Sequence, residues 1–219
     1  MTSGIVLSLN VGRAEPNPAK GVNETGIGKR PVDHAVTVRP PGPKTTGLHS
    51  GVVGDFIGDT KHHGGDDQAV YAYAIEDYAW WSAELGRDLP PALFGENLTT
   101  EGLDLYNAVL GDRWRVGDSV ILETTFGRIP CATFQHRMGE PRWIKRFAAS
   151  NRTGAYLRIL QGGEIRPGDS IEVFERPDHG LTLSEAFDIY MHHPENLSRL
   201  LVADALPAST RTEIEKRIR

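Results

Sequence analysis

The chain has 219 residues and a formal charge of −5 at pH 7. Its composition, 39% hydrophobic and 24% charged, is typical of a globular protein with a sizeable core and excludes a fibrous or mainly disordered chain. The acidic balance argues against a nucleic acid polymer as partner, because such binding depends on a net basic surface that displaces counterions.

Short β-branched or alternating runs, separated by Gly, Pro and Asp turns, predict a β-rich domain from residue 4 to about residue 176. Two similar segments, "RVGDSVIL" at 115–122 and "RPGDSIEV" at 166–173, each predict a Gly-Asp turn that leads into a strand. Many short strands in a chain with 24 glycines indicate a barrel or a sandwich. The clearest runs are 5–9, 35–38, 69–73, 119–122 and 171–174.

Two helices are expected to interrupt this β-rich domain. The segment 75–91 has apolar residues at helical spacing, with Gly86 suited to the position just past the helix end. Residues 142–149 form a weaker helical pattern. The N-terminal segment 12–31, rich in Pro, Gly and polar residues, predicts a long mobile loop or a lid.

After residue 178 the pattern becomes helical, and three short helices are expected. Two Thr-x-x-Glu capping boxes, Thr182 with Glu185 and Thr210 with Glu213, predict two helix starts. The leucines in "LSRLL" have the i, i+3, i+4 spacing of one packed face, which favours a structural role. The sequence therefore predicts two domains, a β domain at 1–177 and a small three-helix domain at 178–219.

Cys131 is the single cysteine of the chain. One cysteine excludes an intramolecular disulfide framework and any iron–sulfur cluster held by several thiolates of this chain, and it favours a reducing, cytoplasmic setting. The sequence shows neither a signal peptide nor a run of about 18 apolar residues, so we expect no export and no membrane partner.

The surroundings of Cys131 leave two interpretations open. A lone cysteine is usually a small, inert, buried hydrophobe. However, Pro130 restricts the backbone just before it, and Arg128 supplies a positive charge that favours the thiolate. A thiolate at this place would be a nucleophile or a ligand to a soft metal.

The stretch "GDTKHHGGDD" at 58–67 gathers polar residues, Asp59 and His63 among them, at no recognised metal-ligand spacing. Gly64 and Gly65 predict either a plain turn or a nest of backbone N–H groups for an anion. Asn97, in "FGENL", is either part of an Asx-type loop or an amide that reads a heterocycle.

Scattered basic residues would form a phosphate pocket if the fold gathered them at one barrel mouth. Guanidinium groups bind phosphate through two N–H donors, and a glycine-linked backbone adds further donors. Solvated surface is the alternative fate of such residues. The candidates are Lys29, Arg128, Arg152 and Thr153.

Several ordered motifs in the chain closely resemble the MOSC family, named for the C-terminal domain of molybdenum cofactor sulfurase. The resemblance covers about residues 22–175, and the helical tail is similar to the three-helix domain that follows MOSC in bacterial single-chain members. The motifs that carry it are "HGGDDQAVY", "FGENL", "LGD", "RIPC" and "RTGAYLR".

This resemblance implies a mainly β fold with some helices, a distorted β-barrel like that of pyruvate kinase. It also implies a molybdenum cofactor, a molybdopterin, with Cys131 as the protein ligand to the metal. Lys29, Arg128 and Arg152, with Thr153, are the expected partners of the pterin phosphate. Asn97 and the Gly64–Gly65 turn are expected at the polar edges of the pterin.

The bacterial relatives that the chain resembles reduce N-hydroxylated compounds such as hydroxylaminopurine-type base analogues. The resemblance therefore implies an oxidoreductase with such a substrate, and His63 or Asp59 would relay protons. The chain shows no dinucleotide fingerprint, so an external flavoprotein or small redox carrier is expected as electron donor. A carrier of cofactor or persulfide sulfur without turnover is the alternative, and the oligomeric state, a homodimer included, stays open.

Overall fold

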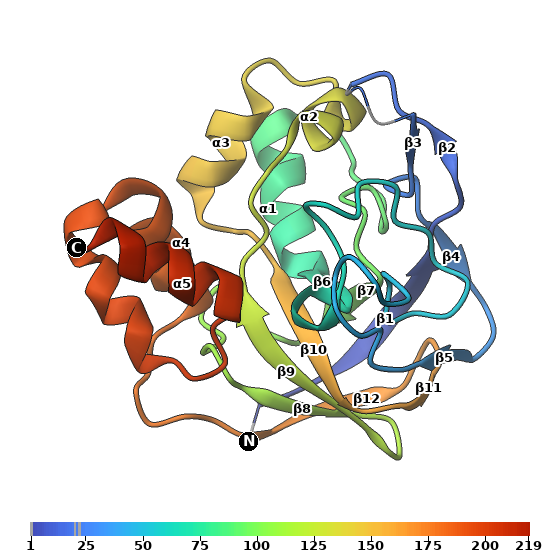
Figure 1. Cartoon of the computed structure of the whole chain (residues 1–219). Coiled ribbons are helices and arrows are strands. Elements are labelled where there is room, and N and C mark those ends of the chain that lie inside the picture. Colours follow the sequence, from blue (N-terminus) through green and yellow to red (C-terminus); the bar gives the residue numbers. More distant parts are fainter. Residues whose placement is uncertain (1, 20, 22) are drawn as a thin grey trace.

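A computed structural model describes residues 2–19, 21 and 23–219, and its centre is a closed β-barrel (Figure 1). Strands follow one another around the barrel in the order β12-β8-β9-β10-β6-β7-β1, and β1 closes the ring by pairing with β12. The neighbours are antiparallel except β6 and β7, which are parallel. The strands are β1 (Thr2–Val11), β6 (Val70–Ala74), β7 (Leu98–Glu101), β8 (Arg113–Val116), β9 (Val120–Phe126), β10 (Ala155–Gln161) and β12 (Ser170–Glu175).

Smaller β elements surround the barrel. The strand β4 (Arg30–Val32) pairs with the end of β1, and β5 (Val36–Val38) pairs with β11 (Gly163–Ile165). A two-stranded ribbon, β2 (Glu15–Pro16) with β3 (Glu24–Thr25), lies within the segment that the sequence predicts as a loop or a lid. The described part of that segment is therefore not structureless, although its service as a lid stays a prediction.

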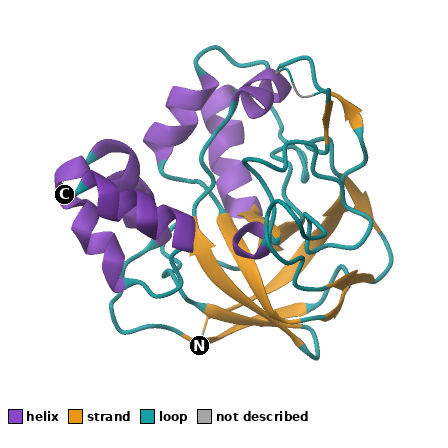
Figure 2. Cartoon of the chain, in the orientation of Figure 1, coloured by secondary structure: helices purple, strands orange, loops and turns teal. Residues whose placement is uncertain are grey.

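Three helices cover one end of the barrel, as Figure 2 shows. They are α1 (Ile75–Leu85), α2 (Ala132–Met138) and α3 (Trp143–Ser150). Helix α1 ends at Gly86, whose φ of 64° confirms the predicted left-handed residue. Buried rings of all three helices pack against one another in a cluster of their own, separate from the aliphatic barrel core. Its large members include Tyr78, Trp81, Phe134, Trp143 and Phe147.

The C-terminal segment forms the three predicted helical pieces, α4 (Leu183–His192), the 3₁₀ helix η2 (Pro194–Val202) and α5 (Ala208–Arg217). Leu197 and Leu200 are fully buried and belong to the same hydrophobic cluster as the barrel strands. The division into two domains stays a prediction. Figure 1 shows the three pieces beside the barrel, next to the helices at its end.

Only one of the two predicted capping boxes starts a helix. Thr182 is the N-cap of α4, and its hydroxyl accepts a hydrogen bond from the Glu185 backbone N–H at 3.2 Å. The second box is wrong, because α5 begins at Ala208, so that Thr210 lies inside its first turn. Pro207 is the reason: its restricted φ suits the entry to a helix, and as the N-cap it starts α5 three residues earlier than Thr210 would.

Strand and helix predictions within the β-rich region are confirmed, and the barrel rather than the sandwich is the observed form. Each predicted run falls on a strand, and 142–149 falls on α3. The sequence analysis did not predict α2, a seven-residue helix that starts directly after Cys131. Among the described residues, none of the helices is long and apolar enough to cross a membrane. A short 3₁₀ helix, η1 (Asp66–Gln68), comes directly before β6.

Candidate functional site

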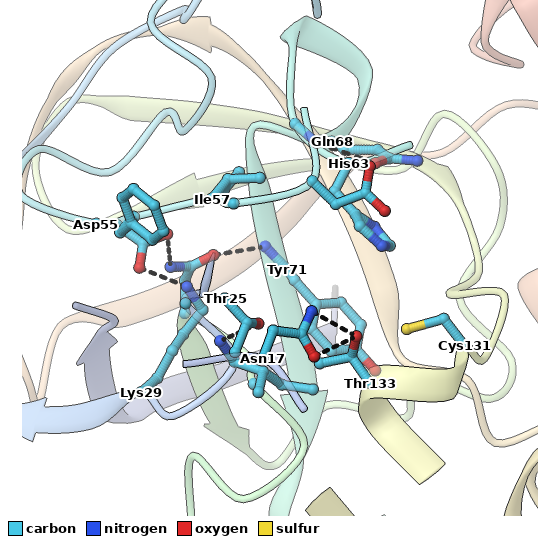
Figure 3. Close-up of a pocket in the computed structure, with 18 of the residues that line it drawn as sticks. Asn17, Thr25, Lys29, Asp55, Ile57, His63, Gln68, Tyr71, Cys131 and Thr133 are labelled. Atoms are coloured by element: carbon cyan, nitrogen blue, oxygen red, sulfur yellow. Dashed lines mark hydrogen bonds and ion pairs between the residues drawn. The ribbon is translucent and has the colours of Figure 1, made fainter. Parts of the chain in front are cut away.

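A pocket lies between the N-terminal ribbon, the 55–68 loop and the start of α2, with Cys131 on one side and the Lys29–Asp55 pair on the other (Figure 3). Its empty volume is about 680 Å³, counting the mouth. We call it the Cys131 pocket, and its walls include Asn17, Lys29, Asp55, Tyr71, Arg128 and Cys131.

The thiol of Cys131 is held at the start of α2 and is only half-buried. Burial by itself raises the pKa of this thiol, but a hydrogen bond from His63, the charge of Arg128 and the Phe134 backbone N–H lower it to about 6. At neutral pH the group is therefore mostly a thiolate. The interpretation as an inert buried hydrophobe does not fit this environment.

Arg128 is buried behind Cys131 and carries its charge into an aromatic surrounding. Its guanidinium lies 4.3 Å from the ring centre of Phe134 and 5.1 Å from that of Tyr71, and it donates a hydrogen bond to the Phe94 carbonyl. Its Nε has no partner, and no carboxylate pairs with it in the described part of the chain. Its anionic neighbour is the Cys131 thiolate, whose charge helps to raise the pKa of Arg128, and the Nε without a partner suits a further hydrogen-bond acceptor.

Lys29 reaches the pocket, as predicted, but its ammonium already has a counterion. It pairs with the carboxylate of Asp55, and the two side chains are 7% and 1% exposed. The same carboxylate accepts hydrogen bonds from the Gly12 N–H at 2.7 Å, the Ser50 hydroxyl at 2.8 Å and the Asn97 amide at 3.1 Å. Lys29 is thus a structural partner of Asp55, and its contact with a pterin phosphate stays a prediction.

Asn97 also lines the pocket, with its side-chain amide committed to the protein. Its Oδ1 accepts from the Tyr71 N–H at 3.2 Å, and its Nδ2 donates to the Asn10 carbonyl at 3.3 Å as well as to Asp55. These bonds tie β6, β1 and the 55–68 loop together. All three bonds are long-range, so the amide neither forms the local bond of an Asx-type loop nor is free to read a heterocycle.

The Gly64–Gly65 turn is at the pocket, although its N–H groups are not free for an anion. The Gly64 N–H donates to Gln68 Oε1 at 3.2 Å, and the Gly65 N–H donates to the His49 carbonyl at 2.8 Å. A Cβ atom on Gly64 would lie 2.5 Å from that same carbonyl oxygen, and both glycines have positive φ. Close approach of the neighbouring loop explains these glycines, and the nest interpretation is not supported.

Arg152 and Thr153 are not brought to the pocket. Arg152 pairs with buried Asp77 on α1 at 2.6 Å and lies over the rings of Trp80 and Tyr106. The buried carboxylate requires a counterion, and this requirement directs the guanidinium away from the barrel mouth. Thr153 is buried behind the wall, where its carbonyl accepts the Tyr71 hydroxyl at 2.8 Å. Neither residue lines the Cys131 pocket, and their contact with a pterin phosphate stays a prediction.

His63 and Asp59 both line the Cys131 pocket, where the sequence analysis expects proton-relay groups. His63 is the hydrogen-bond partner of the Cys131 thiol, while the Asp59 carboxylate lies 3.0 Å from His62 Nδ1. Among the described residues, no group of three or more His, Cys, Asp or Glu side chains is placed to hold a metal ion. Any metal here would depend on the single thiolate for its protein ligand.

Sequence reasoning missed several residues of the site. Asp55 has no motif around it, and its four partners come from four separate segments. Asn17 and Thr133, joined at 3.2 Å, pin the N-terminal ribbon to α2 beside Cys131. The alternation in "AVYAY" was the signal that could have singled out Tyr71, because its side chain shares a face of β6 with Tyr73.

Comparisons with known proteins agree on one family. The MOSC domain model matches residues 59–172. The uncharacterized protein YflK of Bacillus subtilis is 34% identical over 97% of this chain and 93% of its own length. A protein named reductase from Gibberella moniliformis is 33% identical over 80% of this chain, which spans only 30% of that protein. The crystal structure of YiiM from Geobacillus stearothermophilus superposes with a TM-score of 0.79, at 29% identity, over 99% of this chain and 100% of its own.

The lowered pKa predicts the pH dependence of Cys131 reactivity. In the cofactor-free protein, alkylation by iodoacetamide should rise through a midpoint at about pH 6, because the thiolate is the reactive form above that pH. A His63→Ala variant loses a hydrogen bond to the thiolate, so its midpoint should move to higher pH. His62→Ala, at the exposed neighbour, is the matched control and should keep the parent midpoint. Equal midpoints in all three proteins would contradict this assignment.

The Lys29–Asp55 pair predicts a strong coupling in stability. Asp55→Asn leaves a buried ammonium without its counterion and should lower the free energy of unfolding by about 3 kcal/mol in urea denaturation. Adding Lys29→Met removes that unpaired charge, so the double variant should recover part of the loss. Strictly additive losses in the double variant would show that the two groups do not interact.

Proposed function

This chain belongs to the MOSC domain family, and we propose that it holds a molybdenum cofactor in the Cys131 pocket and reduces N-hydroxylated organic compounds there. One observation carries the proposal: the single cysteine of the chain lines the pocket beside buried Arg128, which lowers the pKa of the thiol and whose Nε has no hydrogen-bond partner. A soft ligand and a cation with a free N–H donor suit a metal bound to an anionic organic group.

The residues of the pocket fit such a group. The buried Nε of Arg128 is a hydrogen-bond donor without an acceptor. An anion such as a phosphate would supply the missing acceptor. Cys131 would supply the one protein ligand to the metal. Tyr71, Asn17 and Thr133 would form polar walls around the organic part.

When bound, molybdenum would supply two-electron redox chemistry and affinity for oxygen. The overall reaction is RNHOH + 2 e⁻ + 2 H⁺ → RNH₂ + H₂O, so the protein must deliver two protons and two electrons. His63 touches the thiol and also faces the pocket, which places a proton-carrying group beside the reacting centre. Asp59 lines the same pocket and is the second group proposed for proton transfer.

A carrier of cofactor or sulfur uses the same thiolate, and it is the second candidate function. The relative named reductase favours turnover over storage, although it is much longer than this chain. The surroundings of Cys131 also favour turnover, because a second pocket that is open to solvent is lined by the same residue. The two candidates differ in a single measurable respect, the consumption of an N-hydroxylated substrate.

Metal content tests the proposed ligand set. Protein expressed in a host that makes the cofactor should contain molybdenum and pterin in near-equal amounts, and Cys131→Ala should lose the metal. Arg128→Lys should contain about tenfold less pterin than the parent protein, because an ammonium cannot reproduce the fork of N–H donors of a guanidinium. Molybdenum is measured by mass spectrometry and pterin by fluorescence after oxidative release.

Arg137→Lys is the matched control for Arg128→Lys. Arg137 also donates to a carbonyl of the same loop, that of Leu93, and does not line the pocket. It should keep the parent content of pterin. Undiminished metal in Cys131→Ala would sink the proposed ligation, whereas a loaded parent that consumes no N-hydroxylated substrate would favour the carrier.

We also propose an external electron donor, a flavoprotein or a small redox carrier. The chain shows no nucleotide fingerprint, and one cysteine cannot hold an iron–sulfur cluster. The loaded protein with NADPH alone should therefore reduce no N-hydroxylated substrate, and turnover should begin when a flavin reductase and a carrier are added. Turnover with NADPH alone, at the rate of the completed system, would refute this requirement.

A further inference from the structure

Cys131 lies at the junction of two pockets. The second pocket begins on the other side of the residues that wall the Cys131 pocket, and both are lined by His63, Gly64, Gln68, Cys131 and Tyr156. It is larger, with an empty volume of about 1710 Å³ counting its mouth. A group attached to Cys131 from the first side would thus be reached by another molecule from the second side.

The far wall of the second pocket comes from the C-terminal helical segment. Pro207, Ser209 and Thr210, at the start of α5, face the strand end at Phe126 and the loop at Ile129. Figure 1 shows the start of α5 beside the end of β9, from where the helix runs away from the barrel to the C-terminus. A segment about 80 residues beyond Cys131 in the sequence therefore completes the space next to it.

The walls of this pocket differ in chemistry. Phe126, Ile129 and the prolines 43, 130 and 207 offer flat apolar surface. The amide of Gln68 and the hydroxyls of Ser209 and Thr210 offer hydrogen bonds. Within the described residues, neither hydroxyl forms a hydrogen bond. An apolar face with polar groups around it matches a planar heteroaromatic ring, whose faces are apolar and whose edges carry donors and acceptors.

The ionic groups of the pocket leave little net charge for such a ring to meet. The formal charges of its lining residues balance, with Asp66 and Asp67 against Lys44 and Lys61. Asp67 is also paired with Arg158. The pocket therefore has no strong preference for a charged substrate body.

We propose that the second pocket binds the heteroaromatic body of an N-hydroxylated substrate, and that Ser209 and Thr210 of α5 determine which substrates are accepted. The proposal rests on the proposed reductase function for the identity of the reacting N–OH group. The C-terminal segment is then part of the substrate site, a role that the leucine pattern of its sequence does not indicate. Small N-hydroxyl compounds have no ring to bind in the second pocket, so they reach Cys131 without contacting α5.

A bulky side chain at Ser209 tests the proposal. Ser209 is exposed, so Ser209→Trp fills the pocket without disturbing the core, and Ala208→Trp is the matched control at the exposed neighbour that does not line the pocket. In the loaded enzyme, Ser209→Trp should raise KM for N6-hydroxyadenine about tenfold and leave KM for hydroxylamine unchanged. Ala208→Trp should leave both constants at the parent values.

A second readout needs neither cofactor nor turnover. Cys131 is the single cysteine, so its alkylation in the cofactor-free chain reports access to this position alone. Ser209→Trp should slow the reaction with N-(1-pyrenyl)maleimide about tenfold, with no change for iodoacetamide, which is small enough to pass. Ala208→Trp should react with both reagents as the parent does.

The outcomes separate the two proposals. If the loaded parent reduces neither compound, the reductase function fails, while the alkylation rates still decide whether α5 walls the approach to Cys131. If Ser209→Trp and Ala208→Trp behave alike toward the pyrenyl reagent, or if Ser209→Trp leaves KM for N6-hydroxyadenine unchanged in an active enzyme, the assignment of the second pocket is overturned.

Discussion

The carboxylate of Asp55 is the contact on which the pocket depends. It neutralises the buried ammonium of Lys29 and accepts hydrogen bonds from Gly12, Ser50 and Asn97. These partners come from the end of β1, the N-terminal segment, the loop after β5 and the start of β7. A single buried charge thereby holds four chain segments in one wall, and its removal would leave the other ion without compensation. The wall that contains Asp55 therefore keeps its shape, and Cys131 lies on the opposite wall of the same pocket.

The electrostatics of the opposite wall have the reverse character. Arg128 is buried with aromatic rings rather than carboxylates around it, so its charge acts on the Cys131 thiol instead of being cancelled by a neighbour. His63 adds a hydrogen bond from the loop that separates the two pockets. Of the two buried cations at the pocket, Lys29 is thus paired with a carboxylate, whereas Arg128 acts on the thiol. In the proposed function this difference suits an anionic group that carries a soft metal.

The position of Cys131 between two pockets links this site to the rest of the fold. The barrel, the ribbon and the 55–68 loop form the first pocket, and α5 completes the second. Packing of Leu197 and Leu200 into the barrel core holds the C-terminal segment in this place. A structural feature, the burial of leucines, therefore has a functional consequence at a distance, because it determines where the start of α5 lies relative to the thiol.

By itself, the sequence determined the parts that depend on local patterns. Alternating runs placed the strands, Gly86 ended α1, Thr182 capped α4, and the ordered motifs from "HGGDDQAVY" to "RTGAYLR" indicated the family and Cys131. Short-range sterics and hydrogen bonding govern these features, so a few neighbouring residues suffice to predict them.

Only the tertiary structure decided how the charged residues are used. Lys29 and Arg152 are both residue types that bind phosphate. In the structure, however, Lys29 forms an ion pair with buried Asp55, and Arg152 forms one with buried Asp77. Arg128 alone of the three keeps an unpartnered nitrogen at the pocket. The free energy of a buried charge depends on counterions that lie far away in the sequence, and on how completely water is excluded. No local pattern carries that information, and the fold supplies it.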